Sequence, residues 1–204
     1  MEKRFMIVIL LVIVLSVMAV ELAAMTDVVM NSAETINPGN FKLGVYPLVL
    51  LGNNGGGSDF GIAGRAGLGL TRRIDIELKG AFIENISYFG ADVEFWLLKG
   101  RNINASVALG GHLINVKSGS DSYGFDATFL ASTAPVSKLE IYGGVKLAFD
   151  SVKNSNQNFT MVHIVPGLEY RISRSLDLQA EFGIALNDNS RSYISAGLAF
   201  YSRR

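Results

Sequence analysis

The chain contains no cysteine, which excludes disulfide scaffolds, thiolate metal sites, thiol nucleophiles and lipid attachment to an N-terminal cysteine. Charged residues are also scarce: they make up 18% of the 204 residues, whereas ordinary soluble domains hold about 25%. The 18 Lys and Arg residues balance 18 Asp and Glu residues, so the chain lacks the positive excess that nucleic-acid binding requires. Proline is rare, with 4 residues against 22 glycines. This composition indicates a strand-rich protein with tight turns rather than a disordered chain.

The N-terminus has the pattern of a secretory signal peptide. Two basic residues precede an apolar run at residues 5–20, which only one serine interrupts, and small residues follow. The run falls short of the ~20 residues that a membrane-spanning helix needs, which favours a signal peptide over an uncleaved inner-membrane anchor. Cleavage after Ala19 or after Ala24 fits equally well. We therefore expect a signal peptide at residues 1–24 that directs export.

The segment that follows, residues 25–40, has a mixed, polar composition and ends in the turn sequence Asn37-Pro38-Gly39. This composition predicts a short, poorly ordered lead-in on the periplasmic side. From residue 41 the pattern changes, and we assign residues 41–204 to one β-barrel domain.

From Phe41 onward, apolar and polar residues alternate with a period of two. Strict alternation over roughly ten residues indicates β-strands, and this length suits a strand that crosses a membrane. The apolar positions carry no charge, amide or Ser/Thr hydroxyl. Ten such segments occur, at residues 41–51, 60–70, 74–82, 89–97, 103–113, 123–131, 139–149, 162–170, 176–186 and 194–200.

The alternation alone does not tell which face is inside, because a soluble barrel buries the apolar face and exposes the charged one. Two features favour the inverse: the apolar face holds more side-chain volume than a small barrel encloses, and the charged face is rich in Gly and Ala, as a crowded lumen requires. We therefore predict that Leu78 and Ile184 face lipid. Glu77, Lys146 and Glu181 are then expected in the lumen. The alternative is an exported soluble β-barrel that binds an apolar ligand.

The connections between the segments also alternate in length. Three of them are long and rich in Asn, Gly and Ser, and short turns alternate with these long connections. Transmembrane barrels have long outer loops and short periplasmic turns, so we expect both ends of the barrel domain in the periplasm. Aromatic residues then form a belt at each membrane interface. The outer belt holds Phe60, Phe82, Phe89, Tyr123, Phe125 and Phe149, and the periplasmic belt holds Phe41, Phe95, Tyr170 and Phe200.

In hydrocarbon every backbone N–H and C=O group needs a partner within the protein, so the sheet must close on itself. The sequence thus predicts an all-β fold: a closed antiparallel up-and-down transmembrane β-barrel of about ten strands, preceded by a signal-peptide helix. Eight or twelve strands are the alternatives if Pro47 or the short connection at residues 84–87 is misassigned. Pro47 and Pro166 each remove one ladder donor, and we expect a bulge or a local distortion near each.

This pattern resembles that of bacterial outer-membrane β-barrel proteins over residues 41–201. Ser195, Gly197 and Phe200 match part of the C-terminal signal that the assembly machinery of such proteins reads, although four residues follow Phe200. The resemblance implies an outer-membrane location in a host with two membranes. It implies two partners, the lipid bilayer and the outer-membrane assembly machinery.

The charged face predicts a charge network in the lumen with more acids than bases. These charges either pair and fill the barrel, or their acidic excess attracts cations into a narrow pore. A ten-stranded barrel is narrower than the open porins, which favours a filled, structural barrel. The predicted network comprises Arg65, Asp75, Glu77, Lys79, Glu94, Glu140, Lys146, Glu169, Arg171, Asp177 and Glu181.

Two histidines, His112 and His163, are expected in the outer half of the lumen near Asp126 and Asp150. Some outer-membrane barrels are hydrolases that use carboxylate and histidine groups near the outer rim, so a hydrolase is a further alternative. No catalytic motif of such a family can be placed on this chain, and separate strands supply these four residues. We therefore expect a non-enzymatic barrel without catalytic residues, metal or cofactor.

Overall fold

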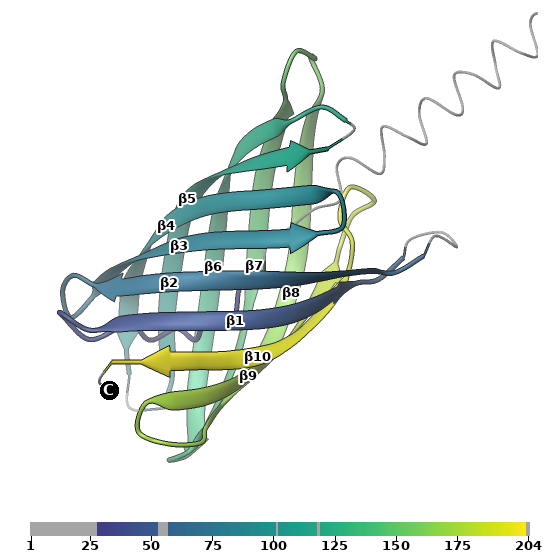
Figure 1. Ribbon diagram of the computed structural model, residues 1–204. Coiled ribbons are helices and arrows are strands. Elements are labelled where there is room, and N and C mark those ends of the chain that lie inside the picture. The colour runs from purple at the N-terminus through teal and green to yellow at the C-terminus, as the bar shows by residue number, and fades with distance from the viewer. Residues whose placement is uncertain (1–27, 53–56, 101, 118, 203–204) are drawn as a thin grey trace, which may run out of the picture.

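The computed structural model describes residues 28–52, 57–100, 102–117 and 119–202, and these residues form a ten-stranded barrel (Figure 1). The expected signal peptide at residues 1–24 lies outside the described residues. Within them, no helix is both long and apolar enough to cross a membrane. The strands are β1 (Phe41–Leu50), β2 (Asp59–Gly69), β3 (Ile74–Ile83), β4 (Ile86–Lys99), β5 (Asn104–Val116), β6 (Ser122–Val136), β7 (Leu139–Val152), β8 (Asn158–Arg171), β9 (Leu176–Ala185) and β10 (Tyr193–Tyr201).

Each strand pairs antiparallel with its sequence neighbours, and β1 pairs with β10 to close the sheet. Only Glu84 and Asn85 join β3 to β4, and Glu84 has the positive φ of 48° that tight hairpin turns use. Ten strands are therefore confirmed, and the alternatives of eight or twelve are wrong. The barrel begins and ends at one rim, where the Phe41 N–H donates to Ser202 Oγ at 3.0 Å. We call this rim the periplasmic end and the opposite rim the outer end, as the predicted topology has them.

The surface is inverted relative to that of a soluble barrel. Leu78 is 65% exposed and Ile184 is 47% exposed on the outer wall, whereas Glu77, Lys146 and Glu181 are each at most 3% exposed in the lumen. The prediction that the apolar face points outward is therefore confirmed. Because a soluble barrel buries its apolar face, this arrangement argues against a soluble ligand carrier.

All ten residues of the two predicted aromatic belts lie exposed on the outer wall. Neighbouring strands bring some of them into contact: the Phe82 and Phe89 rings meet edge to face with centroids 5.5 Å apart, and the Phe125 and Phe149 rings stack at 4.8 Å. Aromatic rings at both rims fit the headgroup regions of a bilayer.

Pro47 and Pro166, two of the three prolines that lie in strands, leave gaps in the hydrogen-bond ladder; the third, Pro135, lies where the β6–β7 register shifts between Thr133 and Val136. Pairing between β1 and β10 stops at Val45, resumes at Leu48 and keeps the same register, with Pro47 in the gap. Pro166 interrupts the β8–β9 ladder in the same way. Because proline has no N–H, a ladder bond is missing while the flanking pairs hold the register. The expected local distortions are present as gaps, and neither is a bulge.

Residues 28–36, which we call the inner segment, lie inside the barrel. Their N–H groups reach side chains on opposite walls, such as Glu181 on β9 at 2.8 Å and Asp75 on β3 at 2.7 Å. Ala33, near the middle of the segment, has no exposed surface. This position differs from the expected poorly ordered periplasmic lead-in. The difference arises because charged lumen groups bind the backbone of a segment that has no strand partner of its own.

Candidate functional site

The site is the lumen itself, and its first part is a chain of ion pairs along the inner wall. The Arg65 guanidinium on β2 lies 2.5 Å from Glu77 on β3 and 3.7 Å from Asp92 on β4. Lys42 Nζ on β1 lies 3.7 Å from the same Glu77. All four side chains are buried. Buried charges need such partners, because an isolated charge in a barrel core loses the solvation of water.

The chain of ion pairs continues across β3 to β7. Lys79 Nζ lies 3.0 Å from both Asp92 and Asp126. His112 lies between two carboxylates: Nδ1 is 3.0 Å from Asp126, and Nε2 contacts Asp150. Acid and base thus alternate from Glu77 to Asp150, and each carboxylate in the middle of this series bridges two cationic or imidazole groups.

The strand register explains why these pairs run diagonally. Directly opposite positions carry like charges, since Arg65 faces Lys79 across β2–β3 and Glu77 faces Asp92 across β3–β4. Like charges directly opposite each other destabilise a sheet. The diagonal contacts Arg65–Glu77 and Lys79–Asp92 compensate, and they tie three strands together.

The second part of the site is the carboxylate of Glu181, which accepts four hydrogen bonds. Two come from the inner segment, from the backbone N–H groups of Val29 at 2.8 Å and Met30 at 2.6 Å. Two come from hydroxyls on the wall, from Tyr142 at 2.9 Å and Tyr193 at 2.6 Å. Met30 has a φ of 39°, a left-handed conformation that costs about 1–2 kcal/mol. This turn directs two successive N–H groups at one carboxylate, as in backbone anion nests.

Two further acids bind the inner segment. Glu94 on β4 accepts a hydrogen bond from Asn31 Nδ2 at 2.7 Å, and Asp75 on β3 accepts one from the Ile36 N–H at 2.7 Å. The acids that hold the inner segment therefore differ from those in the wall chain, which are Glu77, Asp92, Asp126 and Asp150.

Two bases link the wall chain to the carbonyl groups of the inner segment. Lys42 Nζ donates to Met30 O at 2.9 Å and to Asn31 Oδ1 at 2.8 Å. Arg65 Nη1 donates to Val28 O at 2.8 Å while its other terminal nitrogen binds Glu77. The inner segment and the wall chain are thus one connected polar network.

Two inward glycines make room for the tyrosines that bind Glu181. A Cβ on Gly183 would lie 1.9 Å from the Tyr193 ring, and one on Gly167 would lie 2.2 Å from the Tyr142 ring. Both distances are far below van der Waals contact, so a side chain at either position would displace a tyrosine. Some of the glycines on the lumen face are therefore needed because they leave room for large neighbouring side chains.

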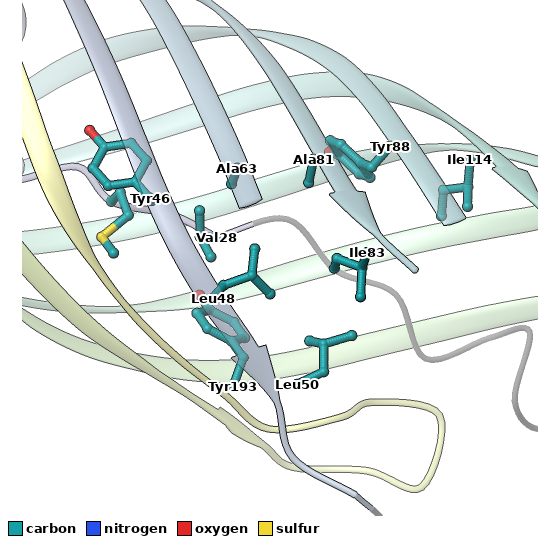
Figure 2. Close-up of a cluster of buried hydrophobic side chains, with 11 residues drawn as sticks. Val28, Tyr46, Leu48, Leu50, Ala63, Ala81, Ile83, Tyr88, Ile114 and Tyr193 are labelled. Carbon is teal, nitrogen blue, oxygen red and sulfur yellow. The ribbon is translucent and has the colours of Figure 1, made fainter. Parts of the chain in front are cut away.

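The outer half of the lumen holds an apolar cluster around Val28 (Figure 2). Its side chains come from β1, β2, β3, β4, β5 and β10 and point into the barrel. The period-two pattern does not reveal this cluster, because apolar residues there occupy both faces of the strands. The cluster comprises Val28, Met30, Tyr46, Leu48, Leu50, Ala63, Ala81, Ile83, Tyr88, Ile114 and Tyr193.

The remaining predicted network residues lie at or near the lumen wall, with one exception. Lys146 and Asp177 are buried, and Glu140 is half-buried. Glu169 is buried and accepts a hydrogen bond from Gln179 Nε2 at 2.6 Å. Arg171 is exposed because it is the last residue of β8, at the periplasmic rim. The prediction placed Arg171 among the lumen charges, and its exposed position differs from that.

The sequence analysis missed the inner segment. The predicted charge network also left out five members of the wall chain (Lys42, Asp92, His112, Asp126 and Asp150), although His112 was expected near Asp126 and Asp150 and does contact both. These five lie on the lumen face that the alternation predicts, so their membership follows once the register is known. The inner segment gave a weaker signal, namely apolar residues such as Val28 and Ala33, which the structure buries, in a stretch whose composition otherwise resembles a linker.

Little empty space remains between the wall and the inner segment. A cavity of about 10 Å³ lies between them, lined by residues that include Val29, Asn31 and Lys79. A cavity of this size holds about one water molecule. The described residues thus fill the lumen along the inner segment.

No protein-family model matches the chain, and no curated protein matches it in sequence. Solved structures match in fold. An outer membrane channel from Pseudomonas putida F1 is 10% identical with a TM-score of 0.55, and the match covers 83% of this chain and 97% of that one. OprG from Pseudomonas aeruginosa is 11% identical (TM-score 0.40; 85% and 100% covered), and a de novo designed transmembrane β-barrel is 17% identical (TM-score 0.42; 82% and 98% covered).

The fold is therefore that of the bacterial outer-membrane β-barrels. The exposed apolar wall and the two aromatic belts are the features that a lipid-facing barrel needs. Together with the closed antiparallel sheet, they give this chain the architecture of a barrel that crosses a lipid bilayer with its strands.

Proposed function

We propose that this protein is a structural, non-enzymatic outer-membrane barrel that is closed to solutes in its resting state. The observation that carries the proposal is the inner segment inside the lumen, which packs so closely against the wall chain that the cavity between them measures about 10 Å³, next to the apolar cluster. A hydrated ion needs a continuous wet path, and paired charges around a buried peptide do not provide one.

A second candidate is a narrow pore that prefers cations. The buried charged groups of the described lumen favour it: nine are acidic (Asp75, Glu77, Asp92, Glu94, Asp126, Asp150, Glu169, Asp177, Glu181) and four are Lys or Arg (Lys42, Arg65, Lys79, Lys146). A water-filled lumen with this acidic excess would attract cations and repel anions.

The two histidines support a non-enzymatic barrel. His112 is buried between Asp126 and Asp150, and His163 is buried with Nε2 3.0 Å from the backbone oxygen of Arg191. A general base needs access to a substrate proton, and neither ring faces solvent. If the barrel hydrolyses nothing by these groups, His112→Ala and His163→Ala variants will retain any hydrolytic activity of the purified protein.

Conductance in planar bilayers tests the proposal directly. The refolded intact chain should insert without producing stable current steps. A reproducible cation-selective step would overturn the closed structural barrel and would favour the second candidate. A small porin inserted in the same membrane is the control for successful recording.

A further inference from the structure

We propose that the lumen is a binding site for an extended polypeptide, which it recognises mainly through the main chain, and that the inner segment occupies this site in the resting barrel. The inference rests on the proposed function in one respect, since it takes the resting lumen as closed. It adds a ligand class, an extended peptide with free N–H groups whose buried side chains are small or apolar around one central amide.

The contacts between the wall and the inner segment support recognition of the main chain. Wall side chains bind six backbone groups along residues 28–36: the N–H groups of Val29, Met30, Ala33 and Ile36 and the carbonyl oxygens of Val28 and Met30. Contacts of this kind tolerate many sequences, because every residue except proline offers the same groups. The barrel wall thus plays the part that a neighbouring strand plays in β-strand addition.

Specificity is concentrated at the centre of the segment. Asn31 donates to Glu94 at 2.7 Å and accepts from Lys42 at 2.8 Å. Its side-chain amide therefore binds one acidic and one basic group at the same time. Ser32 and Ala33 follow, both buried, and the Ala33 N–H donates to Ser132 Oγ at 3.3 Å. The site therefore prefers an amide side chain followed by two small residues.

The site is built from the barrel domain alone. Glu181, Glu94, Asp75, Lys42 and Arg65 all lie on strands, and the wall chain and the two Glu181-bound tyrosines fix several of them independently of the inner segment. A site that is already organised without its ligand loses less conformational entropy when the ligand binds. A barrel without the segment should therefore rebind it as a separate peptide.

Peptide rebinding to a truncated barrel tests the proposal. The barrel variant lacks residues 25–36, is refolded in detergent micelles, and is shown to be folded by heat-modifiable gel mobility. The probe is a fluorescein-labelled peptide with the sequence of residues 28–36, followed by fluorescence anisotropy. We expect saturable binding, at least tenfold weaker for a peptide with Met30→Pro, which lacks one N–H donor to Glu181.

Two matched variants of the truncated barrel separate specific from general effects. Glu181→Gln should weaken binding of the unaltered peptide at least tenfold. Glu169→Gln changes another buried lumen carboxylate, one that accepts from Gln179, and should leave binding unchanged. Absence of saturable binding by folded barrel would overturn the proposal, and so would equal binding of the proline peptide, which indicates partition into micelles.

A second measurement covers the case in which the truncated barrel does not fold. A protease site is placed at residues 37–40 of the full chain, the folded barrel is cut, and excess unlabelled peptide is added. Release of the cut segment into solution by exchange supports the site, whereas a segment that never exchanges with the peptide contradicts it. Bilayer conductance of the intact chain is a separate readout, so a failure of the closed structural barrel is distinguishable from a failure of the peptide site.

Discussion

The carboxylate of Glu181 accepts a hydrogen bond from the backbone N–H of Met30 at 2.6 Å, although 151 residues separate the two. This contact joins the first described part of the chain to β9, one of its last strands. With the N–H of Val29 and the hydroxyls of Tyr142 and Tyr193, it gives Glu181 four hydrogen-bond donors inside the lumen.

Replacement of Glu181 should destabilise the barrel strongly. Glu181→Ala leaves four buried donors without their acceptor, and hydrogen bonds to charged groups are worth about 1.5–3 kcal/mol each but are not additive. We expect a loss of about 3 kcal/mol or more in urea unfolding from lipid vesicles. Glu181→Gln keeps one acceptor oxygen and should fall between the wild type and Glu181→Ala. Unchanged stability of both variants would show that Glu181 does not hold the inner segment.

Gly183 should not tolerate even a methyl group. Its Cβ would lie 1.9 Å from the Tyr193 ring, so Gly183→Ala must move the tyrosine away from Glu181. Overpacking of this kind costs about 1–3 kcal/mol. Gly143→Ala is the matched control, because a Cβ at Gly143 on β7 meets nothing within 4 Å. Urea unfolding of the two variants checks the difference, and equal stability would contradict the packing role of Gly183.

Much of the fold follows from the sequence because one physical constraint dominates it. Lipid on one side and polar groups on the other impose a period of two on every strand, and this pattern located all ten strands and the face of each that points outward. Leu78 outside and Glu77 inside are the simplest example, since adjacent residues of a strand must face opposite sides. The effect of Pro47 on the sheet was predicted less precisely. The sequence indicates a missing ladder bond, but whether a bulge or a simple gap results depends on how the flanking residues pair with β10.

The lumen could be predicted only in part, because its contacts join residues that are distant in sequence. The alternation places Asp126 and His112 on the inner face, but their 3.0 Å contact depends on the β5–β6 register and on rotamers. The sequence of the inner segment shows no period-two alternation of apolar and polar residues, because the segment is not paired with a strand. Its position depends on side chains such as Glu181 and Asp75, which are contributed by opposite walls.

Lys79 should be coupled energetically to Asp126. Its ammonium lies 3.0 Å from both Asp92 and Asp126, so Lys79→Met leaves two buried carboxylates with fewer partners. Breaking a buried pair in this way costs about 3–5 kcal/mol. In a double-mutant cycle, Lys79→Met with Asp126→Asn should be less destabilising than the sum of the single changes, by about 1 kcal/mol or more.

The control for this cycle is Lys117→Met, which removes an exposed lysine after β5. It should change the free energy of unfolding by less than about 0.5 kcal/mol. Strict additivity of the Lys79 and Asp126 changes would mean that the two groups do not interact in the folded barrel.

A charge on the outer wall should be costly in proportion to its depth in the bilayer. Leu78 lies at the middle of β3 and is 65% exposed, so Leu78→Arg puts a guanidinium near mid-membrane and should cost about 2–4 kcal/mol. Leu186 is also exposed but follows β9 at the outer end, so Leu186→Arg should cost about 1 kcal/mol or less. Urea unfolding from vesicles measures both. If the apolar wall instead met water, Leu78→Arg would leave stability unchanged and the protein would stay monomeric without detergent, as the soluble carrier requires. A depth-dependent cost and a need for detergent are the outcome that the inverted wall predicts.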